Sequence, residues 1–122
     1  MDQISIDALP VLQNFLGALV DAAYVVDTEF NLLWVNGAYR QLFGYRPRQR
    51  RPCREVAQME LCAGEQCLLR AALATGQATK YVETQVAGAV ESGAACAVVG
   101  VPLVAQDGRV VAVLGLMRDI SV

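Results

Sequence analysis

The chain has 122 residues, of which 55% are hydrophobic and 18% are charged, and its formal net charge is −2. This length and hydrophobicity fit a single folded domain and exclude a disordered tail. The small net charge predicts no nucleic-acid surface, and the absence of histidine removes the commonest general base and the usual zinc and haem ligand.

The first predicted element is an amphipathic helix within residues 1–22. Pro10 would stand in its first turn, where the missing N–H costs nothing, and Asp7 is the expected cap. Apolar residues recur at helical spacing and form one stripe. The stripe consists of Leu9, Leu12, Phe15, Leu16 and Leu19.

No segment has the character of a membrane span or a signal peptide. The longest uncharged stretch, residues 94–105, is shorter than the ~20 residues that a bilayer crossing requires. We therefore expect a cytoplasmic chain that does not engage a membrane. In that reducing compartment its four cysteines should be thiols unless they bind metal or act in redox chemistry.

Five strands are predicted, near 23–27, 31–35, 79–87, 94–104 and 109–119, because β-branched and aromatic runs alternate with turn residues there. Between the two blocks of strands, Asn36 should cap a helix that Gly44 ends, and Gly76 should end another helix. This order predicts an α+β fold: a five-stranded antiparallel sheet, short helices packed on one face, and the N-terminal amphipathic helix.

Several segments, in this order and spacing, resemble a PAS domain from about Gly17 to Ser121. They are Tyr24-Val25-Val26-Asp27, Trp34-Val35-Asn36-Gly37-Ala38, Leu42-Phe43-Gly44-Tyr45, Val101-Pro102-Leu103, Asp107-Gly108-Arg109 and Arg118-Asp119-Ile120-Ser121. The resemblance implies a PAS domain over residues 23–121, preceded by the helix of residues 1–22. It also implies a sensor or dimerisation module of a larger, bacterial signalling protein, a histidine kinase or a transcription regulator, that relays a signal to an output domain.

PAS domains often hold a ligand between the sheet and the helices, and the resemblance implies candidate residues for such a pocket. Ordinary core packing explains each of them more simply, and a small apolar ligand is the alternative. The candidates are Val26, Trp34, Tyr39, Phe43, Leu69, Leu73, Val99, Val101, Leu114 and Leu116. No acid–base or nucleophile constellation is visible, so no enzymatic activity is predicted.

Cys53, Cys62 and Cys67 lie within fifteen residues, and Cys96 follows. The first three resemble a cysteine-containing subgroup of PAS domains. Burial as small hydrophobes is favoured, while a redox switch and a metal or iron–sulfur site stay open. The absence of a Cys-x-x-Cys pair argues against metal. If a disulfide forms, Cys62 and Cys67 are the pair closest in sequence.

Cys53 has a second interpretation, because a cysteine followed by arginine resembles the flavin-adduct site of light-oxygen-voltage sensors. Pro52 stands where that family has asparagine, and apolar residues replace the expected flavin-binding amides. Those residues are Val98, Val101, Leu114 and Leu116. The residues therefore argue against flavin. The nearby arginines at 46, 48, 50, 51 and 54 favour a solvated loop, with an anion site or a lowered Cys53 pKa as the alternatives.

The apolar stripe of the N-terminal helix also predicts an assembly. If the domain leaves the stripe uncovered, two copies should pair through it, and Leu12→Asp or Leu16→Asp should yield a folded monomer. If the stripe packs on its own sheet, those substitutions should unfold the domain instead.

Overall fold

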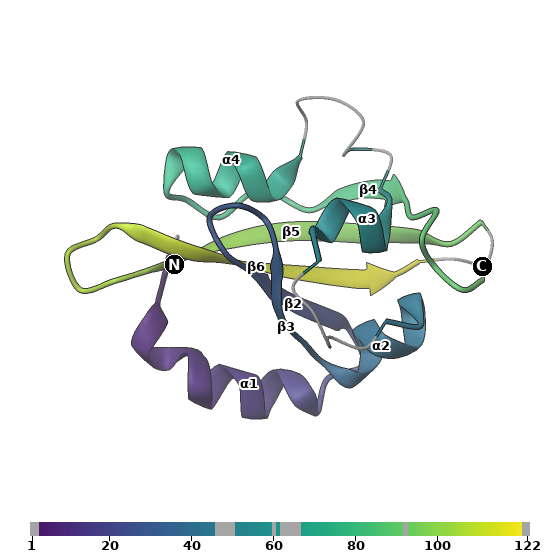
Figure 1. Cartoon of the computed structure of the whole chain (residues 1–122), viewed down its shortest axis with the longest axis horizontal. Helices are drawn as coiled ribbons and strands as arrows, with labels where there is room; N and C mark the ends of the chain where they lie inside the picture. Colours follow the sequence, from purple (N-terminus) through teal and green to yellow (C-terminus); the bar gives the residue numbers. More distant parts are fainter. Residues whose placement is uncertain (1–2, 46–50, 60, 62–66, 92, 121–122) are drawn as a thin grey trace.

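The structure, a computed structural model, describes residues 3–45, 51–59, 61, 67–91 and 93–120. After the N-terminal elements, the strands come in two blocks that are separated in the chain by short helices, as Figure 1 shows. In chain order the elements are β1 (Ile4–Ser5), the 3-10 helix η1 (Ile6–Ala8), α1 (Leu9–Gly17), β2 (Ala22–Val26), β3 (Leu32–Val35), α2 (Gly37–Phe43), α3 (Cys53–Ala57), α4 (Leu68–Thr75), β4 (Val82–Gln85), β5 (Ala95–Val104) and β6 (Val110–Asp119).

In the described part of the chain, six strands form one sheet. The strand order is β1-β5-β6-β2-β3, and β4 also pairs with β5. The five expected strands are present and pair antiparallel, which confirms the predicted α+β sheet. The sequence prediction missed β1, a two-residue strand that runs parallel to β5 and pairs Ile4 with Leu103. Two residues are too few to show the alternation that marks a strand.

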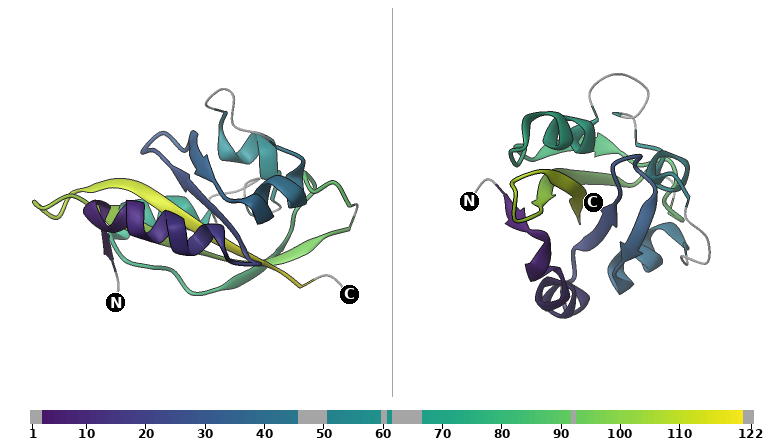
Figure 2. Two further views of the ribbon diagram at one scale, coloured as in Figure 1. Left: turned by 90° about the horizontal axis from the view of Figure 1, so that it is seen from below. Right: turned by 60° about the vertical axis from the view of Figure 1, so that its left-hand side comes forward.

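Helices cover both faces of the sheet. The helices α2, α3 and α4 pack on one face, and α1 packs on the other, as the right-hand view in Figure 2 shows. All five residues of β2 are buried, because its side chains alternate between two apolar layers. The domain therefore has two cores, one between the sheet and α2–α4 and one between the sheet and α1.

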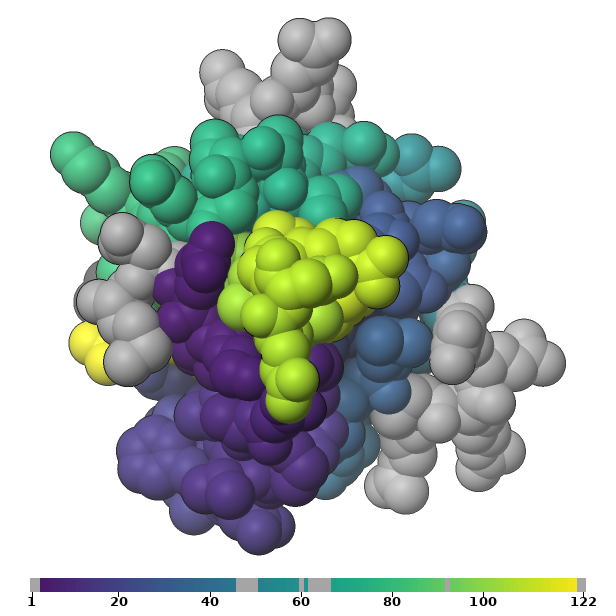
Figure 3. All heavy atoms as spheres, turned by 90° about the vertical axis from the view of Figure 1, so that its left-hand side faces the viewer, coloured from purple at the N-terminus to yellow at the C-terminus, as the bar shows by residue number. Residues whose placement is uncertain are grey.

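The N-terminal segment is part of this second core. Leu16 is buried, and Leu9, Leu12 and Leu19 are partly buried against the sheet. The segment lies against the turn between β5 and β6, as Figure 3 shows, where Gln106 donates a hydrogen bond to Asp7. The predicted boundary at residue 22 thus separates two parts that share one sheet in this structure. The division of the chain at that boundary stays a prediction.

The predicted ends of α2 and α4 are confirmed. The Asn36 side chain caps α2, and Gly44 and Gly76 end α2 and α4 with φ of 63° and 68°. The expected Asp7 cap is wrong, because Ser5 caps η1 and accepts a hydrogen bond from the Asp7 amide. None of the helices in the described residues has the length and hydropathy that a membrane crossing requires.

Candidate functional site

The ten predicted pocket residues fall on two different faces of the sheet. The five on the side of α2–α4, as expected, are Val26, Tyr39, Phe43, Leu69 and Leu73. The prediction was wrong for Trp34, Val101, Leu114 and Leu116, which pack on the α1 side, and for Val99, which pairs with Leu116 in the sheet and shares its face. When a strand is apolar on both faces, its sequence does not show which residues point to which face of the sheet. An error of one residue then assigns every side chain to the opposite face.

Aromatic side chains fill much of the space between the sheet and α2. The ring of Tyr39 lies 5.1 Å from that of Tyr24, 4.6 Å from that of Phe43 and 6.3 Å from that of Tyr45, and all four residues are buried. The Tyr24 ring covers Gly115 so closely that a Cβ atom there would overlap it. Sequence reasoning missed Tyr24 and Tyr45 as core-filling rings. A glycine within a strand was the available signal of a close approach.

A hollow of about 290 Å³ opens beside this aromatic cluster, between α2, the end of β6 and the residues that precede β5. Its floor is apolar and includes Ala22, Ala94 and Met117, while Gln41, Glu91 and Asp119 supply polar groups. Its volume is near the lower limit of small-molecule sites. The predicted small apolar ligand stays a prediction, and this hollow is where the described residues offer it room.

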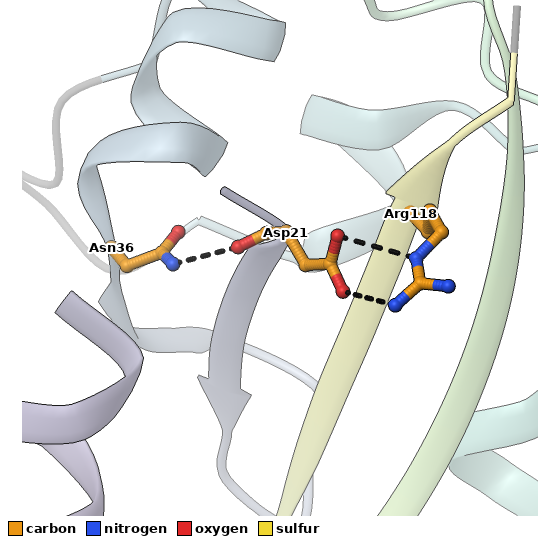
Figure 4. Close-up of polar contacts among 3 residues, drawn as sticks. All are labelled: Asp21, Asn36 and Arg118. Carbon is orange, nitrogen blue, oxygen red and sulfur yellow. Dashed lines mark hydrogen bonds and ion pairs between the residues drawn. The ribbon is translucent and has the colours of Figure 1, made fainter. Parts of the chain in front are cut away.

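Asn36 joins several elements next to this hollow. Its side chain is 2% exposed, and its Oδ1 accepts hydrogen bonds from the amides of Ala23, at 2.9 Å, and Tyr39, at 3.0 Å. Its Nδ2 donates to the carbonyls of Leu16, at 2.8 Å, and Asp21, at 2.9 Å. One amide side chain therefore connects the end of α1, the start of β2 and the start of α2. Figure 4 shows its bond to the Asp21 carbonyl.

The side chain of Asp21 continues this connection to β6. Its carboxylate accepts hydrogen bonds from Arg118 Nε, at 3.4 Å, and Arg118 Nη2, at 3.3 Å (Figure 4). The Arg118 side chain is 68% exposed, so the ion pair adds little to stability. The ion pair instead links the segment after α1 to the C-terminal end of β6.

Burial favours the neutral thiol form of Cys53 and Cys96. Burial first, and then the charge of Cys67, raise the pKa of Cys53 to about 12. The net shift is upward, opposite to the lowered Cys53 pKa that was one expected alternative, because burial outweighs the lowering contributions of Arg54 and Arg70. Burial and the Asp119 carboxylate raise the pKa of Cys96 to about 11. Cys62 and the arginines at 46, 48 and 50 lie outside the described residues.

Cys53 and Cys67 line a second hollow, of about 210 Å³. It lies where the β2–β3 turn meets the starts of α3 and α4, and the Arg70 guanidinium stands 4.6 Å from the centre of the Phe30 ring there. Phe30 has a left-handed φ of 66°. Within the described ranges, no group of three or more potential ligand residues is close enough to hold a metal ion. The predicted absence of metal stays a prediction.

Solved structures with this fold have low sequence identity to the chain. A phage VqmA–DPO complex has a TM-score of 0.72 at 17% identity over 94% of this chain, which spans only 54% of that protein. A PAS domain from Colwellia psychrerythraea gives 0.69 at 18%, covering 93% of this chain and 98% of that one. A sensory box sensor histidine kinase from Vibrio cholerae gives 0.62 at 16%, covering 94% and 91%. No curated protein matches the sequence.

Light-oxygen-voltage proteins are also among the similar structures, so likeness of fold does not by itself assign or exclude flavin. Three of the residues that replace flavin-binding amides, Val101, Leu114 and Leu116, lie on the α1 side of the sheet, away from α2–α4. The family described as the PAS fold matches residues 16–122. With that match over most of its length and the strand order described above, the chain belongs to the PAS family.

Proposed function

We propose that this PAS domain is a sensory signalling module that dimerises through α1 and relays changes between α1 and the end of β6. In this proposal it is cytoplasmic, has no catalytic activity, and serves an output domain of a histidine kinase or a transcription regulator. The fold that it shares with a sensor histidine kinase supports a signalling role. The proposal assigns no direct contact with nucleic acid.

The observation that carries the relay is the position of Asn36. Because it is buried and bonded to four backbone groups, it cannot follow a movement of Leu16 without disturbing Ala23 or Tyr39. The carbonyl that it holds belongs to Asp21, whose carboxylate binds Arg118. A displacement of α1 would therefore reach the end of β6 through the side chains of Asn36, Asp21 and Arg118.

The outer surface of α1 supports the dimer. The side chains of Val11 and Phe15, one helical turn apart, are 74% and 63% exposed. The leucines of the predicted stripe instead pack on the sheet, so the proposed contact is this outer surface and not the stripe as a whole. No charged residue lies between Leu9 and Gly17, which makes a second copy of the same helix a suitable partner across a two-fold axis.

Phe15→Glu is expected to convert the dimer to a folded monomer. Burying a phenylalanine is worth roughly 1.5–3 kcal/mol, so its loss should raise the dissociation constant at least about tenfold for each side chain. Sedimentation velocity measures this, with circular dichroism to verify the fold. Gln13→Glu, which adds the same charge on another side of the helix, is the matched control and should remain dimeric. A wild-type protein that sediments as a monomer at high micromolar concentration would refute the dimer.

A further inference from the structure

We propose that Cys53 and Cys67 are a redox-sensitive dithiol that a hydroperoxide converts to an intramolecular disulfide. This inference goes beyond the relay and the dimer, because it assigns a chemical input to the hollow at the starts of α3 and α4. It rests on the placement of two thiols in one cavity by elements that are separate in the fold.

The geometry gives the two thiols unequal access. Cys53 is 3% exposed, and its amide is held by the Phe30 carbonyl at 2.9 Å, whereas Cys67 is only partly buried at the start of α4. The exposed residues Arg54 and Arg70 line the same hollow. Because Cys67 is the less buried of the two thiols, it is the one that a dissolved oxidant meets first.

The chemistry balances in two steps. The Cys67 thiolate attacks a peroxide oxygen, the O–O bond breaks, and hydrogen peroxide is reduced as Cys67 becomes a sulfenic acid and hydroxide leaves. The Cys53 sulfur then attacks the Cys67 sulfur, the S–S bond forms, and water carries away the sulfenic oxygen. Two thiols and one hydrogen peroxide give one disulfide and two waters. The raised pKa of Cys53 makes the second step faster at alkaline pH.

The disulfide would change the part of the domain that faces the sheet. It would join the first residue of α3 to the residue that precedes α4, and α4 packs against β5 and β6. Oxidation would therefore restrict how these two helices move over the sheet. That effect is separate from the outer surface of α1, which lies on the opposite face.

Peptide mapping of the peroxide-treated full chain tests the proposal. Folded wild-type protein is treated with hydrogen peroxide, remaining thiols are alkylated, and non-reduced peptides are identified by mass spectrometry. We expect a peptide linking Cys53 to Cys67 in the monomer mass, retained in a Cys62→Ser, Cys96→Ser double variant and absent from Cys53→Ser and Cys67→Ser. We also expect the thermal midpoint to rise on oxidation of the double variant.

Three outcomes would overturn the proposal. One is a dominant link between Cys62 and Cys67, the pair closest in sequence. Another is accumulation of Cys67 sulfinic acid without a disulfide. The third is equal formation of the Cys53–Cys67 link in urea, which would show that the fold does not bring the thiols together. Because the readout is a covalent link, its failure is distinct from a failure of the dimer, which sedimentation measures.

Discussion

Asn36→Ala is expected to lower the free energy of unfolding by about 3 kcal/mol. The substitution removes a helix cap, which is worth about 1 kcal/mol, and leaves the buried Ala23 amide without the acceptor that it has here. It also removes the donor that serves the carbonyls of Leu16 and Asp21. Urea unfolding followed by circular dichroism measures the change.

Asn14→Ala provides the control for this result. Asn14 lies on the exposed side of α1, so the same chemical change there should alter the free energy of unfolding by less than about 0.5 kcal/mol. If Asn36→Ala costs no more than Asn14→Ala, the four hydrogen bonds of Asn36 do not hold these elements together as described.

Gly115→Ala is expected to destabilise the domain by about 3 kcal/mol, because the added methyl group would overlap the Tyr24 ring. The ring has little freedom to move away, since Tyr24 is fully buried and packs on Tyr39. Chemical denaturation of the variant gives the cost. A matched control is Gly17→Ala at the end of α1, where no atom lies within 4 Å of the added Cβ and little change is expected.

A double variant tests the cause of that destabilisation. In a Tyr24→Leu background the clash is relieved, so the cost of Gly115→Ala should fall to below about 1 kcal/mol. Equal costs in the two backgrounds would mean that the methyl group disturbs the strand itself and not the aromatic packing.

The parts of the fold that could be predicted from sequence are those with local causes. Asn36 and Gly44 mark the two ends of α2 because a cap and a left-handed residue are requirements of the helix itself. Val110–Asp119 is a strand bounded by a turn at Gly108, which has a φ of 84°. Such signals need no knowledge of the remaining chain.

The face of the sheet on which a residue lies could not be predicted in the same way. In β2 and in the centre of β6 both faces are buried, so Leu114 and Val113 are equally apolar although they belong to different cores. The missing information was that α1 covers the second face. This covering depends on tertiary packing, and it also explains why the leucines of the stripe are not available to a partner.

The candidate site also depends on tertiary contacts that the sequence does not show. The sequence predicted Asn36 as a cap, but its bonds to Leu16 and Asp21 depend on how α1 returns to the sheet. The pKa of Cys53 likewise depends on burial by distant residues, which outweighs the arginines beside it in sequence. The spacing of the cysteines in the sequence also did not indicate that Cys53 and Cys67 line the same hollow.

Amide hydrogen exchange of the wild type and of Asn36→Asp tests most directly the claim that Asn36 couples α1 to the sheet. The aspartate keeps an acceptor for Ala23 and Tyr39 but loses the donor to Leu16 and Asp21. We predict faster exchange in α1, in the first residues of β2 and at the end of β6, while the pairing of β4 with β5 stays protected. Unchanged exchange in α1 and at Arg118, with a loss confined to α2, would contradict the account.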